Sequence, residues 1–432
     1  MRRTAQFPAG NIQLLKEKLI HWAGNFSCCQ CFDFNSYRSF HPQREFLAAI
    51  GIAEKISLHS SVFNSLKDFH HKKKDWLFGY FTYDLKKEIE PAAFSGDDLR
   101  LDGIRFPLAF FFQPEHLIEV IGDSLIIHSA ENPDQIFQAI QQTRTNEIVS
   151  GAKRIKARIT REDYLASVHS LKEHIAGGDL YEINFCQEFY SEDAVVHPPS
   201  LFLRLNRITP SPFACFLKHD NHYLLCASPE RFLKKSQRKI IAQPMKGTIA
   251  RAIEQSDHQR KNELLNDEKE RAENVMIVDL MRNDLARSAE PGSVKVNELF
   301  GIYTFPAVHQ MVSTVSATLR EDLHFTDAIR NAFPMGSMTG APKVMAMQLI
   351  DEYEIVKRGL FSGSAGFITP DGDFDFNVVI RSILYNEEEK YISMQAGSAI
   401  TYDCSPEKEY EECLLKVRGM MKAVAEERAA AV

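Results

Sequence analysis

Two segments of the chain each carry a pair of glutamates at helical spacing. Glu270 and Glu273 lie three residues apart, so on a helix their carboxylates share a face. Glu409 and Glu412 repeat this spacing near the C-terminus, with Lys416 one turn further along. Two helices that each offer a Glu-x-x-Glu pair can build an all-oxygen Mg²⁺ site. Such pairs are also common on solvated helix surfaces, so spacing alone leaves both interpretations open.

The segment 333–343 is rich in small residues, including Gly336 and Gly340, and leads to Pro342. A proline at this place is typical of a helix start, and free N–H groups in such a turn can face an anion. The segment is not a Walker loop, because no Gly-Lys-Ser/Thr follows its glycines. A plain helix-entry turn is the alternative.

Two further residues have side chains suited to chemistry. Lys246 lies between an apolar approach and Gly247-Thr248, where a partly desolvated amine could become a nucleophile. Glu230 follows Ser228-Pro229. Each segment could equally be a turn between strands.

The elements that must position these residues follow from apolar periodicity. Helices are expected at 135–142, 161–176, 257–287, 342–355 and 406–428, and strands at 76–81, 108–112, 116–128, 183–190, 213–217, 222–227 and 361–368. Ser405 and Pro406 are expected to start the last helix as N-cap and first residue. The buried stripes are predicted to be Ala272, Met276 and Leu280 in one glutamate-bearing helix and Tyr410, Leu414, Val417 and Met421 in the other. Strands with interspersed helices, without regular βαβ alternation, favour an α+β fold.

Composition excludes several classes of protein. The 432 residues are 44% hydrophobic and 25% charged, with a net charge of −7, which is ordinary for a globular protein. A mildly acidic chain is a poor candidate for nucleic-acid binding. We find no apolar run of the ~20 residues that a membrane span needs, and no signal peptide, so no membrane association and a cytoplasmic location are expected.

Eight cysteines are too sparse for a disulfide scaffold. Cys28, Cys29 and Cys31 lack the second ligand pair of a zinc site and lie among phenylalanines, which predicts a buried strand with reduced thiols.

Considered together, these segments resemble the chorismate-utilising enzyme family, in order and spacing, from about residue 153 to 422. The matching blocks are Ser228-Pro229-Glu230, Pro244-x-Lys246-Gly247-Thr248, Asp267-Glu268-Lys269-Glu270-x-Ala272-Glu273, Val278-Asp279-Leu280-x-Arg282-Asn283-Asp284, Phe333-Pro334-x-Gly336-Ser337-x-Thr339-Gly340-Ala341-Pro342-Lys343, Arg358-Gly359-x-Phe361-x-Gly363, Ala396-Gly397 and Ser405-Pro406-Glu407-x-Glu409-Tyr410-Glu411-Glu412. The resemblance implies one large α+β unit with two packed antiparallel sheets flanked by helices, as in anthranilate synthase component I. Residues 1–150 would be a divergent N-terminal part of this sandwich, and 151–432 the chorismate-binding catalytic region.

The resemblance also implies roles for individual residues. Mg²⁺ would be held by Glu273 and Glu412, supported by Glu270 and Glu409, and would grip the ring carboxylate of chorismate. Glu230 matches the proposed general acid for the departing ring hydroxyl. The remaining substrate contacts would come from Arg381 at the enolpyruvyl carboxylate, and from Thr339, Gly340, Gly397, His309 and Lys416.

Two positions discriminate among branches of the family. Isochorismate and salicylate synthases use a lysine to activate water where this chain has Glu182, so water addition is disfavoured. Anthranilate synthase large chains have alanine where this chain has Lys246, and the lysine form is typical of aminodeoxychorismate synthase component I. In that branch the lysine amine is thought to attack ring C2, which redirects ammonia to C4. Anthranilate synthase is the alternative, and a non-catalytic relative is disfavoured by the intact Lys246 and Arg381.

The chain shows no Gly-x-Cys-x-Gly nucleophile turn, so ammonia is expected from outside, and the resemblance implies that a separate glutamine amidotransferase subunit supplies it. Two residues depart from the family pattern at positions that the resemblance places near the substrate carboxylates: Phe361 replaces a usual tyrosine, and Ala399 a usual glycine.

Overall fold

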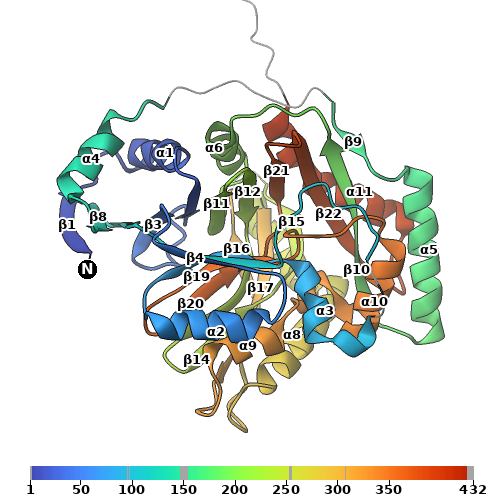
Figure 1. Cartoon of the computed structure of the whole chain (residues 1–432). Coiled ribbons are helices and arrows are strands. Elements are labelled where there is room, and N and C mark those ends of the chain that lie inside the picture. The colour runs from blue at the N-terminus through green and yellow to red at the C-terminus, as the bar shows by residue number, and fades with distance from the viewer. Residues whose placement is uncertain are drawn as a thin grey trace, which may run out of the picture.

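The computed structural model describes residues 2–94, 96, 98–145, 154–252, 255–306 and 308–425. Its architecture is α+β: two antiparallel sheets pack face to face and helices flank them (Figure 1). The predicted fold class is therefore confirmed.

The larger sheet, sheet A, has twelve strands among the described residues. In spatial order they are β1 (Arg3–Pro8), β8 (Ser124–Ser129), β7 (His116–Ile121), β3 (Arg44–Ile50), β2 (Cys28–Asp33), β11 (Phe213–His219), β12 (His222–Ser228), β21 (Ser382–Asn386), β22 (Tyr391–Thr401), β10 (Glu182–Ser191) and β18 (Gly340–Ala341), with β9 (Lys156–Ala157) also paired to β10.

Sheet B has ten strands in the same described ranges. Their order is β15 (Met245–Ala250), β17 (Val308–Thr318), β14 (Lys239–Gln243), β13 (Arg231–Ser236), β20 (Phe374–Asn377), β19 (Ser364–Ile368), β5 (Leu77–Phe81), β6 (Ala109–Gln113) and β4 (Glu54–Leu58), with β16 (Lys295–Thr304) on the outer side of β17.

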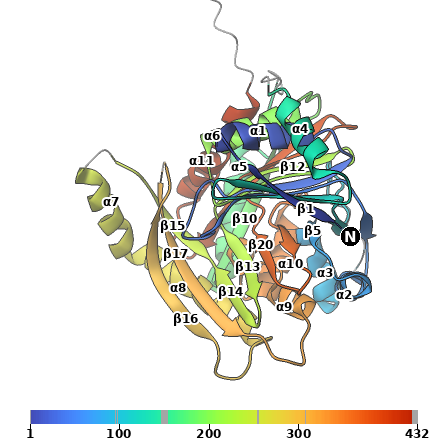
Figure 2. The same ribbon diagram turned by 90° about the vertical axis from the view of Figure 1, so that its left-hand side faces the viewer.

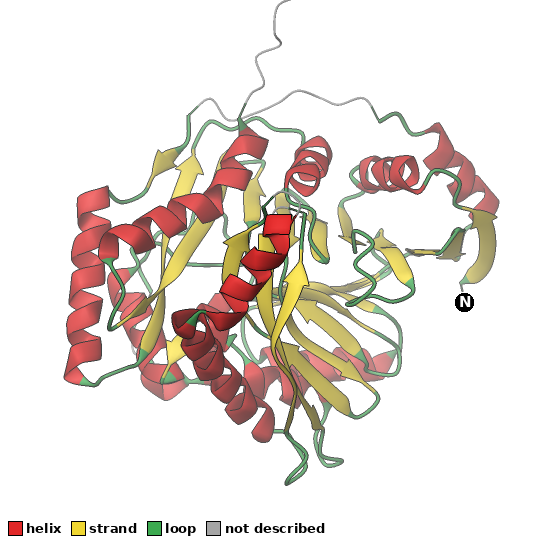
Figure 3. Cartoon of the chain, turned by 180° about the vertical axis from the view of Figure 1, so that it is seen from behind, coloured by secondary structure: helices red, strands yellow, loops and turns green. Residues whose placement is uncertain are grey.

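The helices lie outside the strands (Figure 3). They are α1 (Ile12–Ala23), α2 (Val62–Lys72), α3 (Lys86–Ile89), α4 (Pro133–Gln142), α5 (Arg161–Gly177), α6 (Pro198–Ile208), α7 (Gln255–Asn266), α8 (Glu268–Ala286), α9 (Phe325–Ala332), α10 (Lys343–Tyr353) and α11 (Pro406–Val424), with short 3₁₀ turns at Tyr83–Leu85, Pro91–Ala93 and Gly336–Met338.

Strand alternation divides the core into two main clusters. In β2, Cys28 and Phe32 join the cluster between the sheets, while Cys29 and Cys31 face the other side of sheet A. That second cluster is covered by α1, α4, α6 and α11, whereas α2, α8 and α9 close the far side of sheet B (Figure 2). All eight cysteines are buried and free, as the predicted reduced strand requires.

Strands from the first third of the chain complete both sheets. β2 pairs with β11 in sheet A, and β5 pairs with β19 in sheet B. The predicted boundary between 150 and 151 falls in 146–153, outside the described residues.

Several predicted elements differ from those observed. The single strand 116–128 is a hairpin, because Gly122 adopts φ +55° and turns the chain between β7 and β8. The single helix 257–287 is two helices, because the Asp267 side chain accepts a hydrogen bond from the Glu270 N–H and starts α8 anew. Ser405 occupies the N-cap position of α11 but makes no side-chain cap there, since its hydroxyl bonds Glu407 instead.

The predicted stripes on the two glutamate-bearing helices are only partly correct: Leu280, Tyr410, Val417 and Met421 pack against the core, whereas Ala272 and Leu414 are exposed. On α8, Asn274 is buried beside the exposed Ala272, and its side-chain oxygen accepts a hydrogen bond of 2.6 Å from Ser313 on β17. On α11, Leu414 is exposed and Glu409 is buried, while Val417 lies on the buried face as expected. Hydrophobic periodicity therefore locates both buried faces but misses the polar residues Asn274 and Glu409 that each face also buries.

No helix among these described ranges combines the length and apolar character needed to cross a bilayer.

Candidate active site

Lys246 and Glu182 meet where the two sheets come together. Lys246 is on β15 of sheet B and Glu182 begins β10 of sheet A. The Lys246 Nζ lies 2.5 Å from the Glu182 Oε1 and 3.8 Å from the Glu273 Oε2 on α8. Both partners are buried, with side-chain exposures of 11% for Lys246 and 1% for Glu182. Glu182 Oε2 is buried with no partner among the described residues.

Opposing effects act on the pKa of Lys246. Burial lowers it, but the carboxylates of Glu182 and Glu273 raise it more strongly, so the pKa lies above its ordinary value. In this arrangement Lys246 is an ammonium ion. Desolvation by the protein residues alone therefore does not give Lys246 the free amine that the predicted nucleophile needs.

Glu230 has the properties of a proton donor. It lies between β12 and β13, is 5% exposed, and accepts a hydrogen bond of 2.7 Å from the Ser337 hydroxyl. Burial raises its pKa to about 7, against the lowering effects of Ser337 and Lys246. A carboxyl group with such a pKa can hold a proton near neutrality and release it to a leaving group.

The segment Gly336–Ala341 brings Thr339 and Gly340 beside Glu182. Gly340 pairs with Ile183, and a Cβ there would lie 2.2 Å from the Glu182 carbonyl oxygen, so only glycine fits. Thr339 is fully buried and its hydroxyl donates to the Met335 carbonyl at 2.8 Å.

Arg358 holds the Gly336–Ala341 segment in place through a hydrogen bond to its backbone. Its guanidinium donates to the carbonyl oxygens of Met338 and Asn184 and forms two hydrogen bonds with Glu354. It is 1% exposed. The arginine of the Arg-Gly block is thus a positioning residue for the turn that carries Thr339.

Gly397, Lys416 and Arg381 lie along a neighbouring edge of the site. A Cβ at Gly397 would lie 2.1 Å from the Phe185 carbonyl oxygen, which explains the glycine between β10 and α11. The Gly397 carbonyl accepts a hydrogen bond of 2.8 Å from Lys416, which also pairs with Glu412 at 2.7 Å. The Arg381 guanidinium has no hydrogen-bond or ion-pair partner in the described part of the chain, and burial lowers its pKa while Glu412 raises it. An unpaired arginine here is available to a carboxylate.

The four glutamates of α8 and α11 form one acidic group. Burial and mutual repulsion raise the pKa of Glu270 to about 7 and also raise the pKa values of Glu273 and Glu409. Lys269 lies among them, with its Nζ 3.7 Å from Glu273 and 3.8 Å from Glu409. In contrast, the pKa of Glu412 is lowered, since Lys416 outweighs the effect of burial.

These donors suit a divalent cation chemically, because they are hard oxygen ligands whose repulsion a cation would relieve. Within the described residues, no three His, Cys, Asp or Glu side chains lie close enough together to hold a metal ion. In this structure Lys269 bridges the two helices instead.

His309 does not share hydrogen bonds with the other predicted substrate residues. It is fully buried on β17, with Nε2 2.8 Å from Asp257 on α7 and Nδ1 3.1 Å from the Thr304 hydroxyl. Both ring nitrogens are therefore occupied.

Sequence reasoning assigned no role to several residues that shape the site. Ser337 bonds Glu230, and Lys343 pairs with the buried Asp284 at 2.6 Å, tying the start of α10 to α8. Both residues lie in the quoted motif blocks, which was the available signal. Phe361 is 2% exposed and packs in the core between the sheets.

Comparison with known proteins gives a consistent result. A family model described as chorismate binding enzyme matches residues 29–422. Aminodeoxychorismate synthase component 1 of Escherichia coli (strain K12) is 40% identical over 303 residues, which are 69% of this chain and 66% of that protein. Anthranilate synthase component 1 of Thermus thermophilus is 34% identical over 364 residues, 81% of this chain and 77% of the relative. The chain thus spans slightly less than two thirds of the E. coli relative, and 58% of its 42% identical counterpart from Salmonella typhimurium.

Solved structures share the fold. Anthranilate synthase component I from Streptococcus pneumoniae TIGR4 superposes with a TM-score of 0.75 at 24% identity, covering 86% of this chain and 91% of that one. MenF, the menaquinone-specific isochorismate synthase of E. coli, gives 0.76 at 15% identity, covering 98% and 95%. At these identities the likeness concerns the fold alone.

Proposed function

This chain belongs to the family of chorismate binding enzymes, and from that premise we propose that it converts chorismate and ammonia to 4-amino-4-deoxychorismate, for 4-aminobenzoate and folate synthesis. The observation that carries the choice of product is the buried pair of Lys246 with Glu182. A lysine at this place can attack ring carbon C2, and the E. coli relative named aminodeoxychorismate synthase component 1 supports the same product.

The proposed reaction has two displacements. Lys246 must first lose a proton, and Glu182, 2.5 Å away, is positioned to take it. The freed amine bonds to C2 while the C4 hydroxyl leaves with a proton from Glu230, whose pKa of about 7 suits this donation. Ammonia then bonds to C4 as the C2–nitrogen bond breaks, which returns Lys246 and gives the para amine.

Substrate carboxylates would be held at two places. Arg381, unpaired among the described residues, would bind the enolpyruvyl carboxylate, and the backbone around Thr339, Gly340 and Gly397 would border the ring. Glu273 and Glu412, with Glu270 and Glu409 beside them, would hold Mg²⁺. When bound, this ion supplies the positive charge that allows the ring carboxylate to lie among so many acids.

Ammonia would come from a separate glutamine amidotransferase subunit. The E. coli relative is named as a component 1, which supports a second component. All eight cysteines of this chain are buried in the structure, so none resembles the accessible nucleophile that a glutaminase requires.

The alternative product is anthranilate. It is supported by the Thermus thermophilus relative, an anthranilate synthase component 1 that matches a larger share of this chain. Lys246 disfavours it, because ortho amination needs no nucleophile at C2. Isochorismate or salicylate formation is a weaker alternative, since Glu182 occupies the place of their lysine.

The test is to identify the product. Purified chain is incubated with chorismate, Mg²⁺ and ammonium at alkaline pH, and the products are separated by liquid chromatography with mass detection. We expect 4-amino-4-deoxychorismate. Anthranilate or isochorismate as the main product would refute the proposal.

A further inference from the structure

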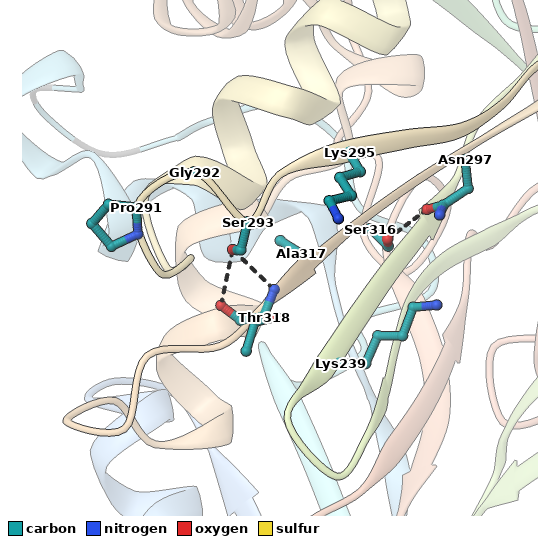
Figure 4. Close-up of a pocket in the computed structure, with 9 residues that line it drawn as sticks. All are labelled: Lys239, Pro291, Gly292, Ser293, Lys295, Asn297, Ser316, Ala317 and Thr318. Atoms are coloured by element: carbon teal, nitrogen blue, oxygen red, sulfur yellow. Dashed lines mark hydrogen bonds between the residues drawn. The ribbon is translucent and has the colours of Figure 1, made fainter.

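A cavity of about 480 Å³ lies at the end of sheet B where β14 begins and β17 ends (Figure 4). Its lining comes from β14, the loop before β16, β16 itself and β17: Lys239, Pro291, Gly292, Ser293, Lys295, Asn297, Ser316, Ala317 and Thr318. The volume is in the range of small-ligand pockets in proteins. We call this cavity the lysine groove.

Strand register places the two lysines of this groove on one face of the sheet. Lys295 lies opposite Ser316, and Lys239 lies opposite Thr318 on the other side of β17. Because Ser316 and Thr318 are two residues apart, they and their direct partners share a face. The two lysines lie on strands on either side of β17, so their backbones are two strand spacings, about 10 Å, apart across the sheet. They are also offset by two residues, about 7 Å, along the strand direction. Flexible four-carbon stems allow both amines to reach one ligand between them.

The positive charge of the groove is not neutralised. Neither Lys239 nor Lys295 forms an ion pair with any residue that the structure describes, and the lining contains no acidic side chain. The nearby acids Glu290 and Glu321 both pair with Arg238 instead. A ligand in the groove would therefore meet two free ammonium groups.

Neutral polar groups complete the lining. The Ser316 hydroxyl donates to the Asn297 side-chain oxygen, which leaves the Asn297 amide N–H₂ without a partner in the described ranges. The Ser293 hydroxyl accepts a hydrogen bond from the Thr318 N–H (Figure 4) and donates one to the Glu290 carbonyl, and these bonds fix the rim. The groove thus combines a fixed rim, an unused amide donor and two mobile cations.

We infer that the lysine groove binds a small polyanion bearing phosphate or carboxylate groups. Its location separates it from the candidate active site, because Met245 beside Lys246 pairs with Val312, in the middle of β17, whereas Lys239 pairs with Thr318 at the end of that strand. The inference is independent of the proposed reaction. Since both lysines are exposed, binding is expected to weaken as salt is added.

Calorimetric titration of the full chain with inorganic pyrophosphate, in Mg²⁺-free buffer of low ionic strength, tests the inference. We expect one saturable site, and a double variant Lys239→Gln/Lys295→Gln with affinity lower by about tenfold or more. The matched control is Lys55→Gln, an exposed lysine on β4 at the opposite edge of the same sheet, which should bind like the wild type. A parallel titration with citrate identifies which anion class the groove prefers.

Arg381→Ala separates the groove from the active site. This variant should retain pyrophosphate binding, since Arg381 lies outside the groove lining. Circular dichroism melting of all variants checks that they fold. Loss of binding in Arg381→Ala, unchanged binding in the double variant, or no saturable binding at all would each overturn the inference.

Discussion

The Lys246 ammonium is held 2.5 Å from the carboxylate of Glu182, across the junction of the two sheets. Each residue is buried, so each compensates a charge that would otherwise be isolated from water. The same contact both stabilises the fold locally and sets the protonation state of the proposed nucleophile.

Removing one member of this pair should cost stability. Lys246→Met leaves the Glu182 carboxylate buried without its closest cation, and we expect a loss of about 3–5 kcal/mol in the free energy of unfolding. The double variant Lys246→Met/Glu182→Gln should recover much of that loss, because no net charge remains unpaired at the contact. Urea unfolding of Lys246→Met, of Glu182→Gln and of the double variant measures the coupling energy between the two residues. If Lys246→Met were as stable as the wild type, the pair would have no structural role.

The identity of the product should depend on Lys246. Lys246→Ala should slow amination at C4 by about 100-fold or more, equivalent to about 2.7 kcal/mol in the barrier, and shift surviving product toward anthranilate. Lys246→Arg keeps the charge but is almost never deprotonated, so it should be equally impaired if the amine is a nucleophile. Mass spectrometry of enzyme incubated with chorismate without ammonia should detect a modified Lys246 peptide. An unmodified peptide together with an active arginine variant would assign Lys246 to electrostatic anchoring.

Activity should require a divalent cation held by the glutamates of α8 and α11. Glu273→Gln or Glu412→Gln should abolish turnover without changing the fold, because each removes an anionic ligand. Activity assays with added Mg²⁺, alongside circular dichroism, check both statements. Full wild-type activity in excess chelator contradicts the assignment.

Mg²⁺ affinity should rise with pH. The pKa of Glu270 is raised from 4.5 to about 7, so near neutrality this carboxyl carries a proton that a cation must displace. Affinity should therefore increase as the pH rises through about 7. Calorimetry in buffers of different ionisation enthalpy measures the protons released, and Glu270→Gln should release fewer than the wild type.

Glutamine alone should not support turnover by this chain. The buried cysteines offer no accessible thiolate to attack a glutamine amide, whereas ammonium at alkaline pH supplies free ammonia directly. Activity assays of the pure chain, with glutamine or with ammonium as the only nitrogen source, test this expectation. Glutamine-dependent product from the pure chain would exclude an external amidotransferase as a requirement.

Acid should destabilise the protein through His41. Burial lowers its pKa from 6.5 to about 3, its Nε2 has no partner among the described residues, and its ring stacks on Phe34 at 3.9 Å between centroids. The unfolded state binds this proton more readily, so stability is lost as the pH falls from 6.5 toward 3. His41→Phe should lose less stability over that interval. Denaturant unfolding of the wild type and of His41→Phe at several pH values measures this difference. If the free energy of unfolding falls equally with pH in both proteins, His41 is not a source of the acid destabilisation.

The helix at Arg161–Gly177 is predicted from apolar residues at helical spacing, a signal that acts locally and is reinforced by the Thr160 capping box. The α+β class follows from the pattern of strands and helices, whereas the two-sheet sandwich follows only from the family resemblance. Motif order also places Lys246, Glu230 and the glutamate pairs near one another. It does not predict the partners: the Ser337–Glu230 bond and the Arg358 contacts join residues far apart in the chain. The polar members of the buried faces of α8 and α11 are missed for a related reason, since Asn274 and Glu409 become buried by tertiary contacts.

The pairing of β5 with β19 has a consequence for how the chain acquires its structure. β5 (Leu77–Phe81) is among the early segments made during synthesis, and its neighbour β19 (Ser364–Ile368) is among the late ones. In the same way, β2 can pair with β11 only after β11 has been synthesised. Because such long loops must close before these contacts form, folding is expected to be slow. Until then the nascent chain carries apolar strands with open edges, so its yield in the cell should depend on temperature and on chaperones that shield those edges.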